Sequence, residues 1–371
     1  MKILIVINDF SVGGAERVTG SLVREFYRDG HSVTLLLFNT KKDNPILSSI
    51  SDKAEIISFS KEKFPNAFFL AGMVRFFLLR RKFDVILCNL QPAAFYIGLL
   101  LPIIQCPVVY ILHNDYPLLK NPVKRLVLRT FYNSRKVTLV SVSEQIAAGF
   151  KLKFKIMPEV ITNGILPPAV NKESTSVLKQ IETLKKDQAT LVFIGIQRLV
   201  WFKNLVVLAE AFRDIHETGY NAILILIGGD PSAGKAEEHR IRSAGAPNVF
   251  LLGQKDNIAD YLVAADCFCI VSSAFEGSPI ALLEAISHGL PVIGTRTGGI
   301  ASIIEDPVNG ILCEPSRESI TQAIIRFIDM PAGERKRIRE ANIRLFNEQY
   351  HEKIMAEKYK GLVSRVTSKA K

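Results

Sequence analysis

Short apolar runs separated by amphipathic segments recur along most of the chain. In the first half they predict buried strands at residues 2–7, 32–38, 83–88, 107–112, 138–141 and 155–161, with a first helix at residues 15–27. After residue 189 the rhythm returns, with predicted strands at residues 190–194, 222–227, 248–252, 267–271 and 291–294, and helices at 205–212 and 280–286. Strands that alternate with helices form parallel sheets covered on both faces, so the pattern predicts an α/β fold.

A polar stretch separates the two halves. Pro167 and Pro168 precede the polar residues 171–188, and such a segment is typical of a domain boundary. The chain has 371 residues, which is enough for two domains. We therefore predict a first domain at residues 1–168, a linker at 169–188, a second domain at 189–344 and an amphipathic C-terminal helical segment at 345–371.

The segment after the predicted strand at 267–271 is rich in candidate chemistry. It holds two carboxylates, Glu276 and Glu284, with Gly277, Ser278 and Pro279 between them at a predicted helix start. Unpaired amides at a helix N-terminus suit oxygen anions, and a carboxylate can accept from two adjacent sugar hydroxyls. The segment predicts a site for a polyol attached to an anion, whereas either glutamate alone is more typical of a solvated surface.

Other candidate ligand groups follow other predicted strands. Arg198 and Lys203 share one loop, where a guanidinium and an ammonium can bind phosphate oxygens. Gly13 and Gly14 open the first helix and would let the backbone approach an anion, although a glycine pair there is also an ordinary turn. His113 ends the strand at 107–112, at the edge where open α/β sheets bind ligands, although a lone histidine is more often structural.

Positive charge is concentrated in the first half. Residues 1–165 carry 22 Lys and Arg against 12 Asp and Glu, a net charge of +10, whereas the remainder carries 25 against 24, a net charge of +1. A basic half suits an anionic membrane or a phosphorylated substrate. We expect no nucleic-acid partner, because the sequence has no zinc-finger spacing and no paired RNA-binding aromatics. The five cysteines lie mostly in apolar runs and predict reduced core residues.

One basic segment allows two interpretations. Residues 64–82 place phenylalanines at helical intervals before three cations. The segment is either a core-facing helix with a basic C-terminus or a surface helix that dips into a membrane and binds lipid phosphates. A second basic cluster lies further along the same half. The candidate membrane or acceptor contacts are Arg80, Arg81, Lys82, Lys124 and Arg125.

Taken together and in order, the motifs resemble those of glycosyltransferase family 4. The residues that carry the resemblance are Gly13-Gly14, His113, Gly195 to Arg198, Lys203, Gly253, Glu276 to Pro279, Glu284-Ala285, Gly289-x-Pro291 and Gly298-Gly299. The match covers nearly the whole chain and is most specific around the two glutamates. It implies the GT-B fold, in which two Rossmann-like parallel-sheet domains face a cleft and the C-terminal helix crosses back to the N-terminal domain.

The resemblance also implies roles for individual residues. Arg198 and Lys203 would bind the donor diphosphate, which Gly13 and Gly14 would approach. Glu284 would bind the ribose, and Glu276 the transferred sugar, assisted by Gly277, Ser278, Pro279 and Ile280. The loop of Gly253, Gln254 and Lys255 would meet the base. The catalytic residues would be Glu276 and His113, with His113 near the anomeric carbon.

The resemblance further implies transfer with retention of configuration, no bound metal and no cofactor, because the nucleotide sugar is a co-substrate. The sequence has no Asp-x-Asp pair of the kind that holds a divalent ion under a diphosphate. A front-face attack assisted by the leaving diphosphate is the usual proposal for the family, and a carboxylate nucleophile is another route. Ser302, Ser278 and Asn204 depart from the family pattern, which weakens inference about donor choice.

The expected activity is transfer of a hexose or N-acetylhexosamine from a nucleotide diphosphate sugar, UDP-sugar before GDP-sugar, to a glycan acceptor. The basic first half and the opening Gly13-to-Arg17 motif favour a lipid-linked oligosaccharide or polysaccharide precursor at an anionic membrane surface. We expect a cytoplasmic protein, peripheral on the inner face of the membrane, without a signal peptide or a spanning helix. The alternatives are a GT-B nucleotide-sugar epimerase and a non-catalytic nucleotide-sugar-binding subunit.

Overall fold

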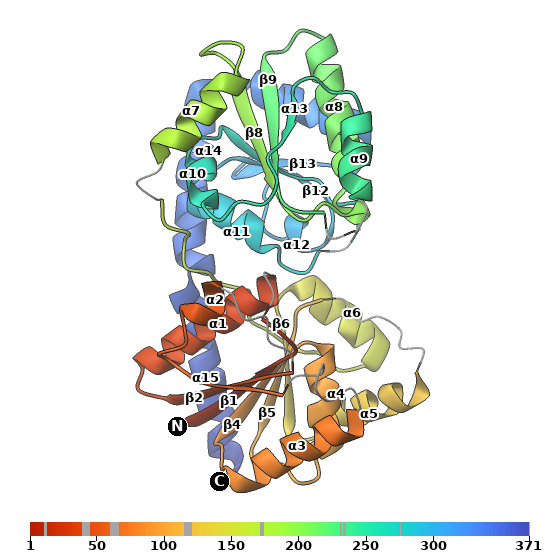
Figure 1. Ribbon diagram of the computed structural model, residues 1–371, viewed down its shortest axis with the longest axis vertical. Helices are drawn as coiled ribbons and strands as arrows, with labels where there is room; N and C mark the ends of the chain where they lie inside the picture. Colours follow the sequence, from red (N-terminus) through yellow and green to blue (C-terminus); the bar gives the residue numbers. More distant parts are fainter. Residues whose placement is uncertain are drawn as a thin grey trace. The chain divides into compact units, whose positions relative to one another are not determined.

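The chain forms two compact units (Figure 1). The structure is a computed structural model that describes residues 1–10, 13–38, 45–59, 67–114, 121–170, 174–230, 232, 235–274 and 276–370. Unit 1 comprises Met1–Leu166 and Tyr350–Lys371, and unit 2 comprises Pro167–Gln349. Each unit contains a parallel sheet with helices against it, as the alternating pattern predicts.

Within the described residues, unit 1 is built on a seven-stranded parallel sheet in the order β3-β2-β1-β4-β5-β6-β7. Its strands are β1 (Lys2–Ile7), β2 (Ser32–Leu37), β3 (Glu55–Ser58), β4 (Val85–Asn89), β5 (Val108–Leu112), β6 (Val137–Ser141) and β7 (Glu159–Val160). Residues 3–7 of β1 are fully buried. Burial on both faces explains why the central strands are nearly continuous apolar runs.

The helices of unit 1 include one from the end of the chain. They are α1 (Gly14–Arg28), α2 (Pro45–Ser48), α3 (Ala67–Arg80), α4 (Gln91–Leu100), α5 (Pro122–Tyr132), α6 (Glu144–Phe154) and α15 (Glu352–Ala370). Helix α15 packs against α1, where Arg24 pairs with the buried Glu352 at 2.7 Å and Lys360 pairs with Asp29 at 2.5 Å. The C-terminal helix therefore packs on the N-terminal domain, as the resemblance implied.

Unit 2 has, among the residues described, a six-stranded parallel sheet in the order β10-β9-β8-β11-β12-β13. Its strands are β8 (Leu191–Ile196), β9 (Ala222–Ile227), β10 (Val249–Leu251), β11 (Cys267–Ile270), β12 (Val292–Thr295) and β13 (Gly310–Cys313). The helices are α7 (Ser174–Leu184), α8 (Leu205–Glu217), α9 (Ala236–Ser243), α10 (Ile258–Val263), α11 (Ile280–Ser287), α12 (Gly298–Ala301), α13 (Arg317–Ile328) and α14 (Ala332–Leu345). Because β9 and β11 flank β8, the strand order reverses at β8, which is where open α/β sheets bind ligands.

Several predicted boundaries differ from those in the structure. The expected linker at 169–188 contains α7, which packs against α10 within unit 2. The strand expected at 155–161 is reduced to the two residues of β7, because Lys155 ends α6 with a left-handed backbone at φ 61°. The C-terminal segment begins with a π-helical turn at Phe346–Tyr350, and α15 starts only at Glu352.

Two short strands were missed by the sequence analysis, whereas its prediction for the cysteines is confirmed. Strands β3 and β13 have four residues each and were not predicted, because runs of that length give little periodic signal. All five cysteines are free and only Cys106 is not fully buried, as expected for reduced core residues. In the described part of the chain, no helix combines the length and the hydropathy that crossing a bilayer requires.

Candidate functional site

Loops at the carboxyl edge of the unit 2 sheet are joined to one another by backbone contacts. The loop after β8 is bound to the loop after β9 through Leu199 N–H, which donates to Gly229 O at 3.0 Å. Gly228 N–H donates to Gly253 O after β10 at 2.9 Å. On the other side, the Ser273 amide after β11 donates to Phe202 O at 2.9 Å. The loops that carry Arg198, Lys203, Gly253 and Glu276 thus lie along one edge.

An ion pair joins two of the predicted ligand residues. Lys203 Nζ contacts Glu276 Oε1, and the two side chains are only 12% and 13% exposed. Ser272 Oγ donates to the same carboxylate oxygen. Partial burial strengthens such a contact, because less water screens the two charges. The pair brings a cation and a carboxylate together at the strand-order reversal, between the loops that follow β8 and β11.

Ser272 is in turn fixed by two threonines, one that ends β12 and one just after it. Its carbonyl accepts from Thr295 Oγ1 at 2.8 Å and from Thr297 Oγ1 at 3.2 Å. Ser272 and Thr295 are fully buried. The next loop also reaches the site, because Gly299 N–H donates to Glu276 O. Glu276 is therefore held through both its side chain and its backbone.

Two glycines allow this close contact between loops. A Cβ on Gly298 would lie 2.2 Å from Glu276 O, and a Cβ on Gly299 would lie 2.1 Å from Gly277 O. Gly298 also has a left-handed backbone, with φ 47°. These distances leave no space for a side chain at either position. The close packing of the two loops therefore explains why residues 298 and 299 are both glycine.

The loop after β8 explains one departure from the family pattern. Asn204 follows Lys203 where the family frequently has glycine, and its backbone is left-handed, with φ 60° and ψ 27°. Asparagine tolerates this conformation better than most residues with a Cβ. Its side chain also donates to Pro315 O at 3.1 Å. Asn204 therefore preserves the turn that places Lys203, while Arg198 is exposed in the same loop.

The start of α11 differs slightly from the prediction. Pro279 is the N-cap and Ile280 the first helical residue, so Pro279 lies one position before the first turn in which it was expected. Gly277 and Ile280 are buried, whereas Ser278 is half-buried. Glu284 lies within α11 and is buried, with 3% exposure. A buried carboxylate in this helix does not fit the solvated-surface alternative.

The predicted base-binding loop follows β10. Gly253 has a left-handed backbone with φ 69°, which suits glycine. Gly253 and Gln254 are exposed and Lys255 is half-buried. The loop is joined to Gly228, so it lies at the same edge as Arg198 and Lys203.

The predicted ligand residues of unit 1 lie at the carboxyl edge of its own sheet. Gly13 is the N-cap of α1, and a Cβ there would lie 2.4 Å from the buried Glu16 side chain. His113 follows β5 and is 8% exposed. Its Nε2 lies 2.9 Å from Oδ1 of Asn89, the last residue of β4. Burial lowers the pKa of His113 to about 4, so the imidazole is neutral at pH 7.

The basic residues predicted to contact a membrane or an acceptor differ in their contacts within the protein. Arg81 pairs with Glu55, and this contact raises the pKa of Arg81. Arg80 lies over the ring of the exposed Phe76 at 4.0 Å, and Lys124 lies 5.7 Å from the ring of Phe95. Lys82 and Arg125 are exposed.

Helix α3 combines the two interpretations of residues 64–82. Phe77 is buried and packs against Phe59 and Phe83, whereas Phe76 and Leu79 are exposed. The helix thus has a core-facing side and an exposed apolar side. Residues 64–66 lie outside the described residues, and helix α3 begins at Ala67.

Sequence reasoning missed the residues that support the site. Ser272, Thr295 and Thr297 come from two strand ends and meet only in the folded sheet, so no spacing reveals them. Asn89 is a polar residue that ends a buried strand, which is the one signal that pointed to it. Among the described residues, no group of three or more His, Cys, Asp or Glu side chains is arranged to hold a metal ion.

Two family models match the chain. The model described as Glycosyltransferase Family 4 matches residues 12–167, and the model described as Glycosyl transferases group 1 matches residues 176–345. The chain belongs to the family 4-like glycosyltransferases. The two matches cover most of both units and include every residue predicted above to bind the donor.

Relatives and solved structures agree with this assignment. The chain is 33% identical over 218 residues to an uncharacterized glycosyltransferase of Methanocaldococcus jannaschii, covering 53% of this chain and 52% of that protein. It is 28% identical to the UDP-Gal:alpha-D-GlcNAc-diphosphoundecaprenol alpha-1,3-galactosyltransferase of Escherichia coli, covering 48% of this chain and 46% of that enzyme. The chain therefore spans about half the length of these curated relatives.

The fold of this glycosyltransferase is GT-B. Anabaena HepE, solved in complex with UDP and glucose, matches with a TM-score of 0.82 and 21% identity, covering 98% of this chain and 99% of HepE. The two Rossmann-like parallel-sheet units and the returning C-terminal helix are those that the motifs implied.

Proposed function

We propose that this glycosyltransferase moves a hexose or N-acetylhexosamine from a nucleotide diphosphate sugar, UDP-sugar before GDP-sugar, to a glycan acceptor. The observation that carries the proposal is the ion pair of Lys203 and Glu276 at the strand-order reversal of unit 2. The ammonium of Lys203 suits the diphosphate of the donor, and the carboxylate of Glu276 suits its sugar hydroxyls. When one donor molecule binds, these two contacts would replace the ion pair between Lys203 and Glu276.

The neighbouring residues would bind the rest of the donor. Arg198 would join Lys203 at the diphosphate, Glu284 would bind the ribose, and Gly277 to Ile280 would assist at the sugar. Gly253, Gln254 and Lys255 would meet the base, and Gly13 and Gly14 would approach the phosphates. The complex of HepE with UDP and glucose and the UDP-Gal in the name of the Escherichia coli relative support a UDP-sugar.

The reaction we propose proceeds with retention and without a bound metal or cofactor. The acceptor oxygen would form its bond to the anomeric carbon on the face from which the diphosphate leaves, and a diphosphate oxygen would take the acceptor proton. Lys203 and Arg198 would stabilise the charge that develops on the leaving group. Because Lys203 and Ser272 both hold one oxygen of Glu276, we assign Glu276 to orienting the sugar and not to nucleophilic attack.

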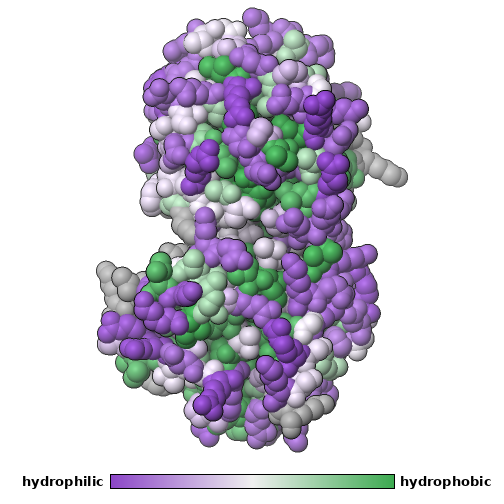
Figure 2. All heavy atoms as spheres, turned by 180° about the vertical axis from the view of Figure 1, so that it is seen from behind, coloured by the Kyte–Doolittle hydropathy of each residue, from purple (hydrophilic) through white to green (hydrophobic). Residues whose placement is uncertain are grey.

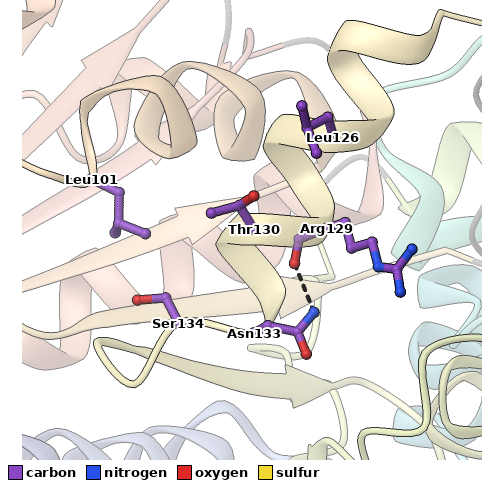
Figure 3. Close-up of a pocket in the computed structure, with 6 residues that line it drawn as sticks. All are labelled: Leu101, Leu126, Arg129, Thr130, Asn133 and Ser134. Atoms are coloured by element: carbon purple, nitrogen blue, oxygen red, sulfur yellow. Dashed lines mark hydrogen bonds between the residues drawn. The ribbon is translucent and has the colours of Figure 1, made fainter.

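We further propose a lipid-linked acceptor at the cytoplasmic face of an anionic membrane. Helix α5 supports this assignment, because Val123 and Leu126 are 60% and 67% exposed beside Lys124, Arg125 and Arg129. Figure 3 shows Leu126 and Arg129 on α5 among the residues that line a pocket. The volume of this pocket is about 600 Å³. The pocket is lined by Leu101, Leu126, Arg129, Thr130, Asn133 and Ser134.

Apolar patches alone do not select this surface. Figure 2 shows hydrophobic side chains gathered between hydrophilic ones on both units. Helices α5 and α3 both carry exposed apolar side chains among cations and have no acidic residue, but Arg81 just after the end of α3 is paired with Glu55. Exposed apolar side chains among cations are the composition by which a helix binds an anionic lipid surface.

Thermal shift against UDP-, GDP-, ADP- and dTDP-sugars tests the donor site. A ligand that binds only the native state at 100 times its Kd stabilises it by about 2.7 kcal/mol. This raises the melting temperature by about 3–4 °C when the whole chain unfolds as one unit and by about 7 °C when unit 2 unfolds by itself. Glu284→Ala should abolish most of this shift, whereas Glu340→Ala on the exposed face of α14 should preserve it. The donor site is misassigned if no nucleotide sugar shifts the melting point or if Glu284→Ala keeps the full shift.

Product analysis then separates the classes of activity. A transferase releases the nucleoside diphosphate only when a glycan acceptor is present, apart from slow hydrolysis. An epimerase would convert the sugar without an acceptor, and a non-catalytic subunit would bind the donor and release nothing.

A further inference from the structure

The carboxyl edge of unit 1 holds a buried side-chain contact that the donor site does not use. Asn89 ends β4 with no exposed surface, and His113 directly follows the neighbouring strand β5. Among the described residues, the one side-chain hydrogen bond of His113 runs from Nε2 to Asn89 Oδ1 at 2.9 Å. An amide oxygen can only accept, so this contact requires that Nε2 carries the imidazole proton.

The backbone beside Asn89 is strained. Leu90 has φ 67° and ψ 156°, a conformation in which a Cβ is crowded and which glycine alone adopts readily. Residues in such conformations persist where the surrounding structure fixes them, and they cluster at functional sites. Here the strained residue joins Asn89, at the end of β4, to the start of α4.

Two amide groups next to Leu90 add a second observation. Within the part of the chain that the structure describes, Asn89 Nδ2 and Gln91 Nε2 are buried without a hydrogen-bond partner. Burying such donors is unfavourable, so a native fold that retains them has a reason to do so. The side chain of Asn89 does contact the imidazole of His113. This contact points to the placement of His113 as the reason why a buried asparagine is retained here.

We propose that Asn89 is a positioning residue that fixes His113 in the Nε2-protonated tautomer, so that Nδ1 serves as a hydrogen-bond acceptor for a substrate hydroxyl. The role of His113 rests on the proposed function, whereas the tautomer does not. An imidazole held in this way accepts through Nδ1 and cannot donate from it. Burial alone accounts for the lowered pKa of His113, so the ring stays neutral at pH 7.

Nitrogen NMR of the histidine-labelled full chain tests the tautomer directly. The chain has six histidines, and His113→Gln identifies the signal of interest by its loss. In the wild-type protein we expect a protonated Nε2 and an unprotonated Nδ1. Asn89→Leu should yield a mixture of tautomers. A wild-type signal with the proton on Nδ1, or an unchanged signal in Asn89→Leu, would overturn the proposal.

Asn89→Asp supplies a second signature. A carboxylate also accepts from Nε2, so the tautomer is retained, but its negative charge raises the pKa of His113. The transfer rate of this variant should fall at low pH and recover as pH rises above the new pKa. An Asn89→Asp protein whose pH profile matches the wild type would contradict the positioning role.

Asn163→Leu is the matched control. Asn163 is also a buried asparagine of unit 1 with an unpaired side-chain oxygen, and among the described residues the side-chain hydrogen bond of His113 goes to Asn89 and not to Asn163. This variant should leave the tautomer of His113 unchanged. In contrast, Asn89→Leu should lower kcat about tenfold, the lower end of the effect of removing an outer partner of a functional histidine, without changing KM for the donor. Equal effects in both variants would assign Asn89 a purely structural role.

The outcomes separate this inference from the proposed function. If the wild-type protein transfers no sugar, the proposed function fails while the NMR result still decides the tautomer. If the tautomer is as expected but His113→Ala transfers at the wild-type rate, the substrate role of His113 and with it this proposal are overturned, while the transferase assignment stands.

Discussion

Ser272 connects the carboxylate of Glu276 to the sheet of unit 2. Its hydroxyl donates to Glu276 Oε1, and its carbonyl accepts from Thr295 at the end of β12 and from Thr297 just after it. The hydrogen bond orients a charged group, and such bonds contribute about 1.5–3 kcal/mol when measured by mutation. Ser272 therefore decides which way the carboxylate faces before any donor binds.

Ser272→Ala should weaken the binding of the sugar part of the donor and leave the binding of the nucleotide part unchanged. Because Glu276 is proposed to hold the sugar and not the diphosphate, we expect Kd for the nucleotide sugar to rise about tenfold, which corresponds to 1.4 kcal/mol. Kd for the nucleoside diphosphate alone should stay the same. Calorimetric titration of both ligands measures the difference. The control is Ser273→Ala, at an exposed serine whose hydroxyl donates to Phe202 O, and it should change neither value.

Equal weakening of both ligands by Ser272→Ala would show that the serine supports the loop as a whole. In that case Glu276 would not be the residue that recognises the sugar.

At the scale of the elements, α12 packs closely against the loop that carries Glu276. A Cβ on Gly299 would meet the backbone oxygen of Gly277 at 2.1 Å, and backbone cannot move aside as a flexible side chain can. We expect Gly299→Ala to destabilise the protein by about 1–3 kcal/mol, the usual cost of overpacking, and to weaken donor binding by displacing the loop.

Gly333→Ala in α14 is the opposite case. Nothing lies within 4 Å of a Cβ at this position, and alanine is favoured over glycine in helices. This variant should be stabilised by about 0.4–1 kcal/mol. Chemical denaturation measures both changes. If the two substitutions change the free energy of unfolding in the same direction, the close approach of α12 to the loop is not what excludes a side chain at position 299.

The elements also show what the sequence could and could not predict. Central strands such as β1 and β9 are buried along nearly their whole length, so their apolar runs are unambiguous. The short strands β3 and β13 and the helix α7 in the expected linker had no such signal. Polar composition marks a solvated surface, and a helix with one buried side can have that composition as readily as a linker can.

The site divides in the same way. Arg198, Lys203, Glu276 and Glu284 could be proposed as ligand residues because family motifs fix their spacing. The contacts of Ser272 with its two threonines, and of Asn89 with the predicted His113, were not foreseen because each joins residues from strands that are adjacent only in the sheet. Contacts across parallel strands depend on strand order, which one sequence does not reveal.

At the scale of the whole molecule, the distribution of charge is the property that bears on the acceptor. Residues 1–165 carry a net charge of +10, and the remainder carries +1. Not all of this charge is available to a partner, because Arg81 is paired with Glu55. Lys124, Arg125 and Arg129 on α5 are exposed beside exposed Val123 and Leu126, so α5 has a stronger claim to membrane contact than the Arg81 region.

Flotation with vesicles that contain anionic lipid tests this claim. Each cation near an anionic surface contributes about 1 kcal/mol, so the triple variant Lys124→Gln, Arg125→Gln, Arg129→Gln should bind about 100-fold more weakly. The matched control, Lys336→Gln, Arg337→Gln and Arg344→Gln on α14, removes the same charge from exposed positions of unit 2 and should bind as the wild type does. Binding of the wild type should weaken as salt shortens the Debye length from about 10 Å at 0.1 M. Equal losses in both triple variants would indicate attraction by net charge without a docking helix, and absence of flotation would remove the membrane from the proposed function.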